Sequence, residues 1–246
     1  MSEFNDIFGI KPYGEALKIT VEKSADGVGK FLSAICLPAA TEFGLMLQDK
    51  MRYWRLNNII KMITKSQEKY EFIDEKLHLK LNPRIGVEII ENASWQDNET
   101  ILDMWAGLLA SSIDKNGSDD SNLIFIHILK SLTGMQCCIL NYICQNSKAL
   151  YDKNGLIYTD SYCELDMEKL FEISGSNDIN RLDRELDHLR SLELLPNSGM
   201  FGGGGGFSIN QEDFSKVSLQ PSSLALHLYS KVNGYKDIKD CYVVKN

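Results

Sequence analysis

The sequence predicts a mainly α-helical protein of two domains. Apolar residues recur at intervals of three and four along most of the chain, which is the spacing of one helix face. A loop-forming stretch, DKNGSDD at residues 114–120, separates two groups of helical segments, and a run of five glycines lies between strand-like sequences near the end. We therefore expect an N-terminal helical domain over residues 1–116. A winged-helix-like α+β domain with a small β-hairpin should follow over residues 121–234, and then a C-terminal tail over residues 235–246.

The first domain is expected to begin with two long helices. Residues 12–36 carry small or apolar side chains in an alternating spacing of four and three, which is typical of a helix that packs on another helix. Residues 41–73 follow as the most basic element of the chain, with Trp54 and Ile63 expected in its apolar stripe. These two segments predict a helical hairpin or a bent pair of helices.

Two further helices of this domain are indicated by their start signals. Asn82 can cap a helix with its side chain, and Pro83 after it suits the first helical position because that position needs no N–H donor. Ser94 and Asp97 resemble a capping box with Asp in place of Glu, which predicts a second start. The helix after that start should bury Trp105.

The second domain mixes helices with short strands. Residues 156–162, LIYTDSY, are β-branched and aromatic and predict a strand, and residues 194–220 predict a strand, a glycine tip and a second strand. Helices are expected over residues 123–132, 135–144, 165–173, 178–193 and 221–234. This order is that of a winged helix with one additional leading helix. The tail is expected to add a strand through residues 241–244.

Composition and charge exclude several classes of protein. The chain has 246 residues, a formal charge of −8 and a pI near 5.1, which argues against a surface that binds polyanions everywhere. The basic residues nearly balance the acidic ones over residues 1–80, so the acidity lies after them. The first residues carry no basic secretory signal, no apolar stretch is long enough to span a membrane, and the six cysteines form no CxxC pair. A cytoplasmic protein with reduced thiols is therefore expected.

No motif in the sequence supplies a catalytic constellation. The four histidines include no HExxH pair, no GxSxG elbow is present, and Gly27-Val-Gly29-Lys30 lacks the spacing of a phosphate-binding loop. We therefore expect no catalytic residues, no cofactor, no metal and no small-molecule substrate, and we expect the protein not to be an enzyme.

Two groups of basic residues are candidates for binding a partner or nucleic acid. On the expected recognition helix, Arg181 and Arg184 share a face with His188, and a winged helix could use such a face in the DNA major groove. The acidic residues of the same helix favour an alternative, a solvated face of ion pairs. The six candidates over both groups are Arg52, Arg55, Lys61, Arg181, Arg184 and Arg190.

The basic helix over residues 41–73 leaves several partners open. Its mixture of cationic and aromatic side chains suits nucleic acid, an anionic membrane surface or an acidic protein. The alternative is an ordinary exposed basic face with Trp54 in the core. A further candidate is the glycine run, which is expected to form a flexible wing tip able to order against a partner. It consists of Gly202, Gly203, Gly204, Gly205 and Gly206.

The segment PAATEFGLMLQDKMRYWRLNN, residues 38–58, resembles the abortive-infection alpha family, which is named from bacterial phage-resistance loci. The matching positions are Glu42, Gly44, Tyr53, Arg55 and Asn57 or Asn58. The resemblance continues through later helical segments and spans about residues 12–234. The family pattern has a His-Pro-like pair where Asn122 and Leu123 stand, so no role of such a histidine carries over.

This resemblance implies a bacterial cytoplasmic component of phage defence without established catalytic residues. The first hypothesis is therefore a non-enzymatic abortive-infection protein that acts by binding a protein partner or a phage component. The alternative is a winged-helix regulator that binds nucleic acid, and a second alternative is a toxin acting at the membrane surface.

Overall fold

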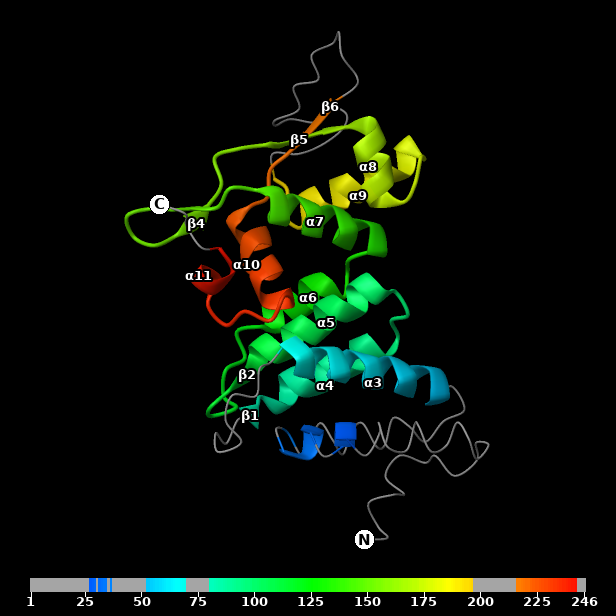
Figure 1. Cartoon of the computed structure of the whole chain (residues 1–246), viewed down its shortest axis with the longest axis vertical. Coiled ribbons are helices and arrows are strands. Elements are labelled where there is room, and N and C mark those ends of the chain that lie inside the picture. Colours follow the sequence, from blue (N-terminus) through cyan, green and yellow to red (C-terminus); the bar gives the residue numbers. More distant parts are fainter. Residues whose placement is uncertain are drawn as a thin grey trace. The chain divides into compact units, whose positions relative to one another are not determined.

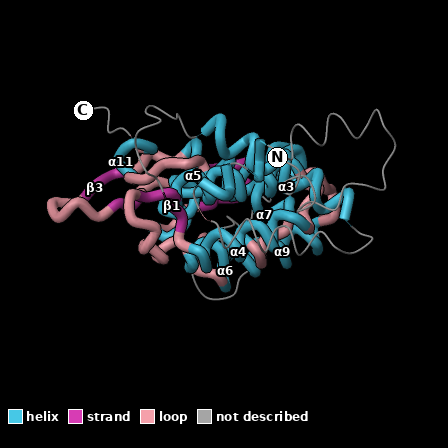
Figure 2. The backbone as a smooth tube through the Cα atoms, turned by 90° about the horizontal axis from the view of Figure 1, so that it is seen from below, coloured by secondary structure: helices cyan, strands magenta, loops and turns pink. Residues whose placement is uncertain are grey.

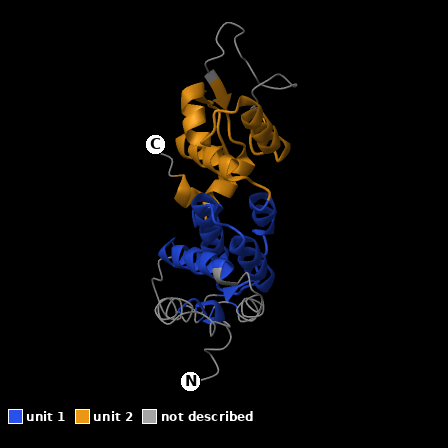
Figure 3. Ribbon diagram, turned by 90° about the vertical axis from the view of Figure 1, so that its right-hand side faces the viewer, with its two compact units in different colours: residues 1–130, 231–236 blue, residues 131–230, 237–246 orange. Residues whose placement is uncertain are grey.

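A computed structural model describes residues 27–29, 31–34, 36, 52–69, 80–196 and 216–242. Most of the expected helix over residues 12–36 lies outside these ranges, as do the start of the basic helix, the five glycines and residues 243–246. Two compact units are present (Figure 3). Unit 1 comprises residues 1–130 and 231–236, and unit 2 comprises residues 131–230 and 237–246. These units differ from the expected ranges, because residues 117–130 and 231–236 belong to unit 1.

The described residues of unit 1 form a packed set of helices with one short strand pair (Figure 1). Its elements are α3 (Arg52–Lys69), β1 (Lys80–Leu81), α4 (Pro83–Ser94), α5 (Glu99–Ser112), β2 (Ile113–Asp114) and α6 (Leu123–Leu129). Strand β1 pairs antiparallel with β2, with Leu81 opposite Ile113. Trp105 of α5 is fully buried, as expected, together with Ile59 and Ile63 of α3. The apolar faces of α3, α4 and α5 therefore form the core of this unit.

The helix starts of unit 1 confirm one predicted cap and correct another. Asn82 accepts a hydrogen bond from the Arg84 N–H at 3.0 Å, and Pro83 is the first residue of α4. The expected Ser94–Asp97 capping box is wrong, because Ser94 is the buried last residue of α4. The cap of α5 is Asn98, whose side chain accepts from the Ile101 N–H at 3.1 Å. Ser94 and Asn98 are only four residues apart in the sequence, but Ser94 ends α4 whereas Asn98 caps α5.

The predicted loop after α5 is closed by one aspartate. The Asp114 carboxylate accepts hydrogen bonds from the backbone N–H groups of Asn116, Gly117 and Asp119. Partial burial acts to raise the pKa of Asp114, but these donors together lower it below its usual value. Gly117 has a φ of +67°, a conformation that glycine adopts without strain. Side-chain and glycine chemistry therefore hold this turn.

Residues 231–236 complete unit 1 by packing against α5. A Cβ built on Gly107 would lie 1.7 Å from the Val232 carbonyl oxygen, so only glycine allows the two backbones to approach this closely. Gly234 follows with a φ of +92°, and its N–H donates to the Lys231 carbonyl at 3.0 Å. Gly107 is therefore the position at which residues 231–236 pack closely against α5.

Unit 2 contains short strands among its helices (Figures 1 and 2). Its elements are α7 (Gly134–Asn146), β3 (Leu150–Tyr151), β4 (Ile157–Tyr158), β5 (Cys163–Asp166), α8 (Met167–Ser174), α9 (Ile179–Ser191), β6 (Lys216–Leu219), α10 (Ser223–Val232), whose last two residues belong to unit 1, and α11 (Ile238–Cys241). The protein is thus mainly helical, as expected, with small antiparallel strand pairs.

Strand β5 pairs antiparallel with β6, with Leu165 opposite Val217, and both of these side chains are buried. The chain between the two strands includes α8 and α9, so a pairing across about fifty residues closes this part of unit 2. The expected strand over residues 156–162 is confirmed only at β4. Thr159 and Ser161 form a local hydrogen-bonded turn after it. The expected glycine hairpin tip lies outside the described residues.

The C-terminal tail differs from its prediction at the two expected strand positions that are described, residues 241 and 242. Cys241 ends α11 rather than beginning a strand. Asp237 caps this helix by accepting from the Lys239 N–H at 2.9 Å, so a local side-chain contact outweighs the strand propensity of the following residues. Among the described residues, no helix is both long and apolar enough to cross a membrane.

Replacing Gly107 with alanine should destabilise unit 1 by about 3 kcal/mol, because the added methyl group overlaps the Val232 carbonyl and residues 231–236 must move away from α5. Urea denaturation followed by circular dichroism measures this loss. Gly27→Ala is the matched control, since Gly27 is helical and a Cβ there meets nothing within 4 Å. Equal stability of the two variants would contradict the close approach of α5 and Val232.

Candidate interaction surfaces

Arg55, a predicted partner-binding residue, is held inside unit 1 by three contacts. Its guanidinium donates to Glu91 Oε2 at 2.9 Å and to Ser94 Oγ at 3.0 Å, and it lies 4.2 Å from the centre of the Trp95 ring. Only 15% of its side chain is exposed. Because guanidinium stacks well on aromatic faces and pairs with carboxylates, Arg55 fixes the end of α4 against α3.

The lysines of α3 continue this contact along α5. Lys61 pairs with Glu99 at 3.1 Å, Lys65 pairs with Glu99 at 3.3 Å and with Asp103 at 3.7 Å, and Lys69 pairs with Asp103 at 3.0 Å. Partner positions increase together along both helices, so α3 and α5 run in the same direction. The pKa of Glu99 is lowered, chiefly by the hydrogen bonds from Lys61 and Lys65. Much of the basic stripe of α3 therefore faces carboxylates of its own unit.

Trp54 is not a core residue, contrary to the prediction. It is 39% exposed, whereas Ile63 is fully buried. Nine positions separate the two residues, which is about two and a half helical turns, so they lie on opposite faces of α3. Trp54 instead meets Trp95 of the α4 end, with ring centroids 6.4 Å apart and planes tilted by 57°. The buried positions of α3 are Leu56, Asn58, Ile59, Ile60, Met62, Ile63 and Ser66.

Sequence reasoning missed Trp95 as a surface feature. Trp95 follows Ile90, the last isoleucine of the α4 stripe, by five positions, which turns it away from the buried side. It is 45% exposed. An aromatic residue outside the apolar periodicity of its helix was therefore the available signal, for Trp54 as for Trp95.

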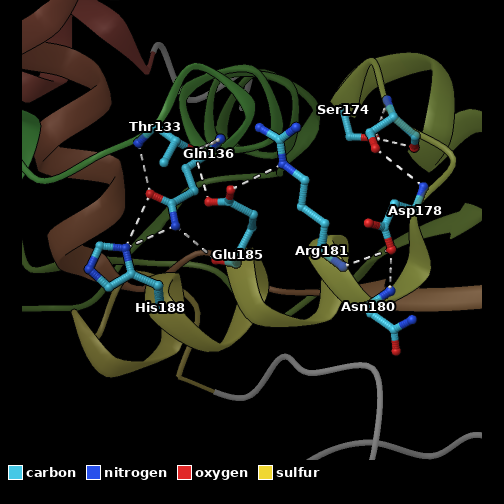
Figure 4. A network of polar contacts seen from close by, with 9 residues as sticks. Thr133, Gln136, Ser174, Asp178, Asn180, Arg181, Glu185 and His188 are labelled. Carbon is cyan, nitrogen blue, oxygen red and sulfur yellow. Dashed lines mark hydrogen bonds and ion pairs between the residues drawn. The ribbon is translucent and has the colours of Figure 1, made fainter.

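Contacts within unit 2 occupy part of the α9 face that was predicted to contact DNA (Figure 4). Gln136 of α7 contacts His188 Nδ1 at 2.9 Å and donates to the Glu185 carbonyl at 3.1 Å. Thr133 Oγ1, at the start of α7, donates to the nearly buried Glu185 carboxylate at 2.8 Å. His188 and Glu185 therefore join α9 to α7, and His188 lies in this interhelical contact.

The arginines of α9 differ in their surroundings. Arg181 pairs with Glu185 at 3.6 Å, and Arg190 pairs with Asp187. Arg184 is exposed and makes no ion pair with any residue that the structure describes. Of the three predicted arginines, Arg184 is thus the one whose charge is directed to solvent without a described carboxylate partner.

Two other predicted groups are not located. The Arg52 backbone begins α3, but its side chain lies outside the described residues, as do the five glycines from Gly202 to Gly206. The roles proposed for them stay predictions, as does contact of the basic helix with a membrane surface.

The described residues offer little metal or thiol chemistry. No group of three or more His, Cys, Asp or Glu side chains that could hold a metal occurs among them. All six cysteines are free thiols. Burial raises the pKa of Cys137 to about 12 and that of Cys241 to about 11, so both thiols stay protonated at neutral pH.

Glu99→Gln should weaken the acid sensitivity of the fold. Because the pKa of Glu99 is lower in the folded chain than in the unfolded one, its charge stabilises the fold above about pH 4.3. This contribution disappears as the pH falls through the lower folded value. Urea denaturation at pH 7 and pH 3 should show a smaller loss for Glu99→Gln than for the natural chain. Glu164→Gln, at an exposed acid without a described ion pair, should behave as the natural chain does, and identical losses for both variants would contradict the α3–α5 pairing.

Comparison with known proteins places these elements in a family. No curated protein and no solved structure matches the chain. The family model "Abortive infection alpha" matches residues 55–202, which are more than half of the chain and extend from the first turn of α3 to beyond α9. The match begins at Arg55, inside the segment whose resemblance the sequence indicated. The chain belongs to the abortive-infection alpha family.

Proposed function

We propose that this protein is a non-enzymatic component of abortive phage defence that acts by binding a protein partner or a phage component in the bacterial cytoplasm. The observation that carries the proposal is the family match over residues 55–202. Abortive infection halts a phage through a response of the infected cell, so a member of such a family needs a contact that couples infection to that response.

The surface chemistry supports binding through contact rather than through a general field of positive charge. Four cationic side chains of α3 pair with carboxylates of α4 and α5, so much of their charge is neutralised within unit 1. Large apolar side chains nevertheless remain exposed, and aromatic and aliphatic residues are what most protein contacts bury. They are Trp54, Trp95, Ile124, Leu156, Tyr158, Tyr162, Ile179 and Tyr235.

Expression of the gene in a susceptible host should reduce plaque formation at a low phage dose while the culture collapses at a high dose. This difference arises because infected cells die before they release phage. The measurement compares plaque counts and culture density at both doses, with an empty vector as the control. Survival of infected cells at both doses would contradict abortive infection.

The non-enzymatic part needs a test of its own. Purified protein is incubated with lysate from infected cells, and the nucleic acids and nucleotides are followed for cleavage. Reproducible phage-dependent hydrolysis, lost on replacement of one acidic residue or one lysine, would contradict it.

A second candidate is a nucleic-acid-binding regulator with a winged helix in unit 2. After α7 and the β3–β4 pair, the order β5, α8, α9, β6, with β5 antiparallel to β6, supports this fold. In a winged helix, α9 would be the helix that enters the major groove. The exposed Arg184 favours this candidate, whereas Asp183 and Asp187 on the same helix oppose phosphate contact.

If unit 2 binds DNA in this way, Arg184→Ala should weaken binding to a mixed-sequence duplex by about 1–3 kcal/mol, because it removes the arginine without a described carboxylate partner. Fluorescence anisotropy at 50 and 200 mM salt measures the affinity and its salt dependence. Lys153→Ala, at an exposed lysine of the β3–β4 turn, is the control. Absent or salt-independent binding by the natural chain would remove this candidate.

A further inference from the structure

An exposed pair of tryptophans marks one corner of unit 1. Trp54 lies in the first turn of α3 and is 39% exposed. Trp95 directly follows α4 and is 45% exposed. Their ring centroids are 6.4 Å apart. Tryptophan buries more apolar surface on binding than any other side chain and dominates many protein interfaces. We call this pair the tryptophan corner.

The tryptophan corner is fixed before any partner arrives. Glu91 Oε1 accepts the Trp95 indole N–H at 3.0 Å, while Glu91 Oε2 accepts from Arg55 at 2.9 Å. Arg55 in turn covers the Trp95 ring at 4.2 Å. Because the indole is held by a hydrogen bond, a cation and a second ring, a partner would lose little side-chain entropy by ordering it.

Among the residues that the structure describes, the solvent-facing charge near Trp95 is acidic. Asp97, two residues after Trp95, is exposed and makes no ion pair with a described residue. The Glu91 side chain is 42% exposed, whereas that of its partner Arg55 is only 15% exposed. An incoming group therefore meets carboxylates and indole rings, which both attract a cation.

We propose that the tryptophan corner binds a basic segment of a protein partner, with a lysine or arginine side chain placed over an indole face and near Asp97. Charge complementarity favours this occupant, because the exposed carboxylates attract a cation and repel the phosphate groups of a nucleic acid. The inference rests on the proposed function in that it supplies the contact that a binding protein requires. Unlike the proposed function, this inference can be tested with purified protein alone.

A nine-residue peptide of alternating glycine and arginine is the probe. The chain has three tryptophans, and because Trp105 is fully buried, changes in fluorescence on titration report Trp54 and Trp95. We expect this peptide to bind. We also expect caesium ions to quench the tryptophan fluorescence more strongly than iodide ions do, because nearby carboxylates attract the cation. A glycine–glutamate peptide and a single-stranded oligonucleotide are expected not to bind.

Two variants locate the contact. Trp54→Leu and Asp97→Asn should each weaken the arginine peptide roughly twofold to fivefold, the size of one exposed cation–π contact or charge contact. Leu156→Ala and Asp160→Asn change exposed residues of unit 2 and should leave the affinity unchanged. Calorimetric titration measures the affinities, and thermal unfolding shows that each variant is folded.

Absent binding, equal affinity of all four variants, or preference for the acidic peptide or the oligonucleotide would each overturn the proposal. The phage assay separates this failure from failure of the proposed function. Phage protection by the natural chain combined with no peptide binding leaves abortive infection standing and removes the tryptophan corner. Peptide binding that depends on Trp54 and Asp97 supports the corner even if the host shows no protection.

Discussion

The packing of α3 on α5 is the constraint on which unit 1 depends. One face of α3 places Ile59 and Ile63 in the core that also contains Trp105, and the adjoining stripe pairs lysines with Glu99 and Asp103. Apolar burial supplies most of the stabilisation, because exposed ion pairs contribute little each. The ion pairs do not select one register by themselves, because the three lysines are four residues apart and a shift of α3 by one turn would again place lysines beside Glu99 and Asp103. The contacts of Arg55 with Glu91, Ser94 and Trp95 are not repeated along α3, so they favour one register.

The strands of unit 2 are too short to form a stable sheet alone, so contacts between distant residues must hold this unit together. The β5–β6 pair joins residues about fifty positions apart, and the Thr133–Glu185 and Gln136–His188 contacts join α7 to α9. Satisfying Glu185 with a hydroxyl donor and Arg181 avoids the cost of an unpaired buried carboxylate. Polar groups that resemble a binding face in sequence are thus used to orient the helices.

Some local signals were predictable from sequence, and contacts between distant segments were not. The start of α4 at Asn82-Pro83 and the burial of Trp105 depend on neighbours within one helix. Arg55 and Trp95 meet across forty positions, so a single sequence gives no sign that the cation is already occupied. The misplacement of Trp54 is different in kind. Its position relative to Ile63 contradicts a shared stripe, and strict counting of helical turns would have placed it on the surface.

The pairing of charges within each unit determines what the surface can recognise. Carboxylates of α4 and α5 neutralise cations of α3, so binding that depends on long-range attraction has weak support there. Several aromatic and aliphatic side chains remain exposed, and at the tryptophan corner Trp95 is fixed in place by the same Arg55–Glu91 pair that joins the helices. An interaction that stabilises the fold thereby also orients an exposed side chain. Removal of Arg55 would therefore disturb both the fold and the orientation of Trp95. Trp54 and Asp97 take no part in the Arg55–Glu91 ion pair, so substitutions there can change recognition without removing that pair.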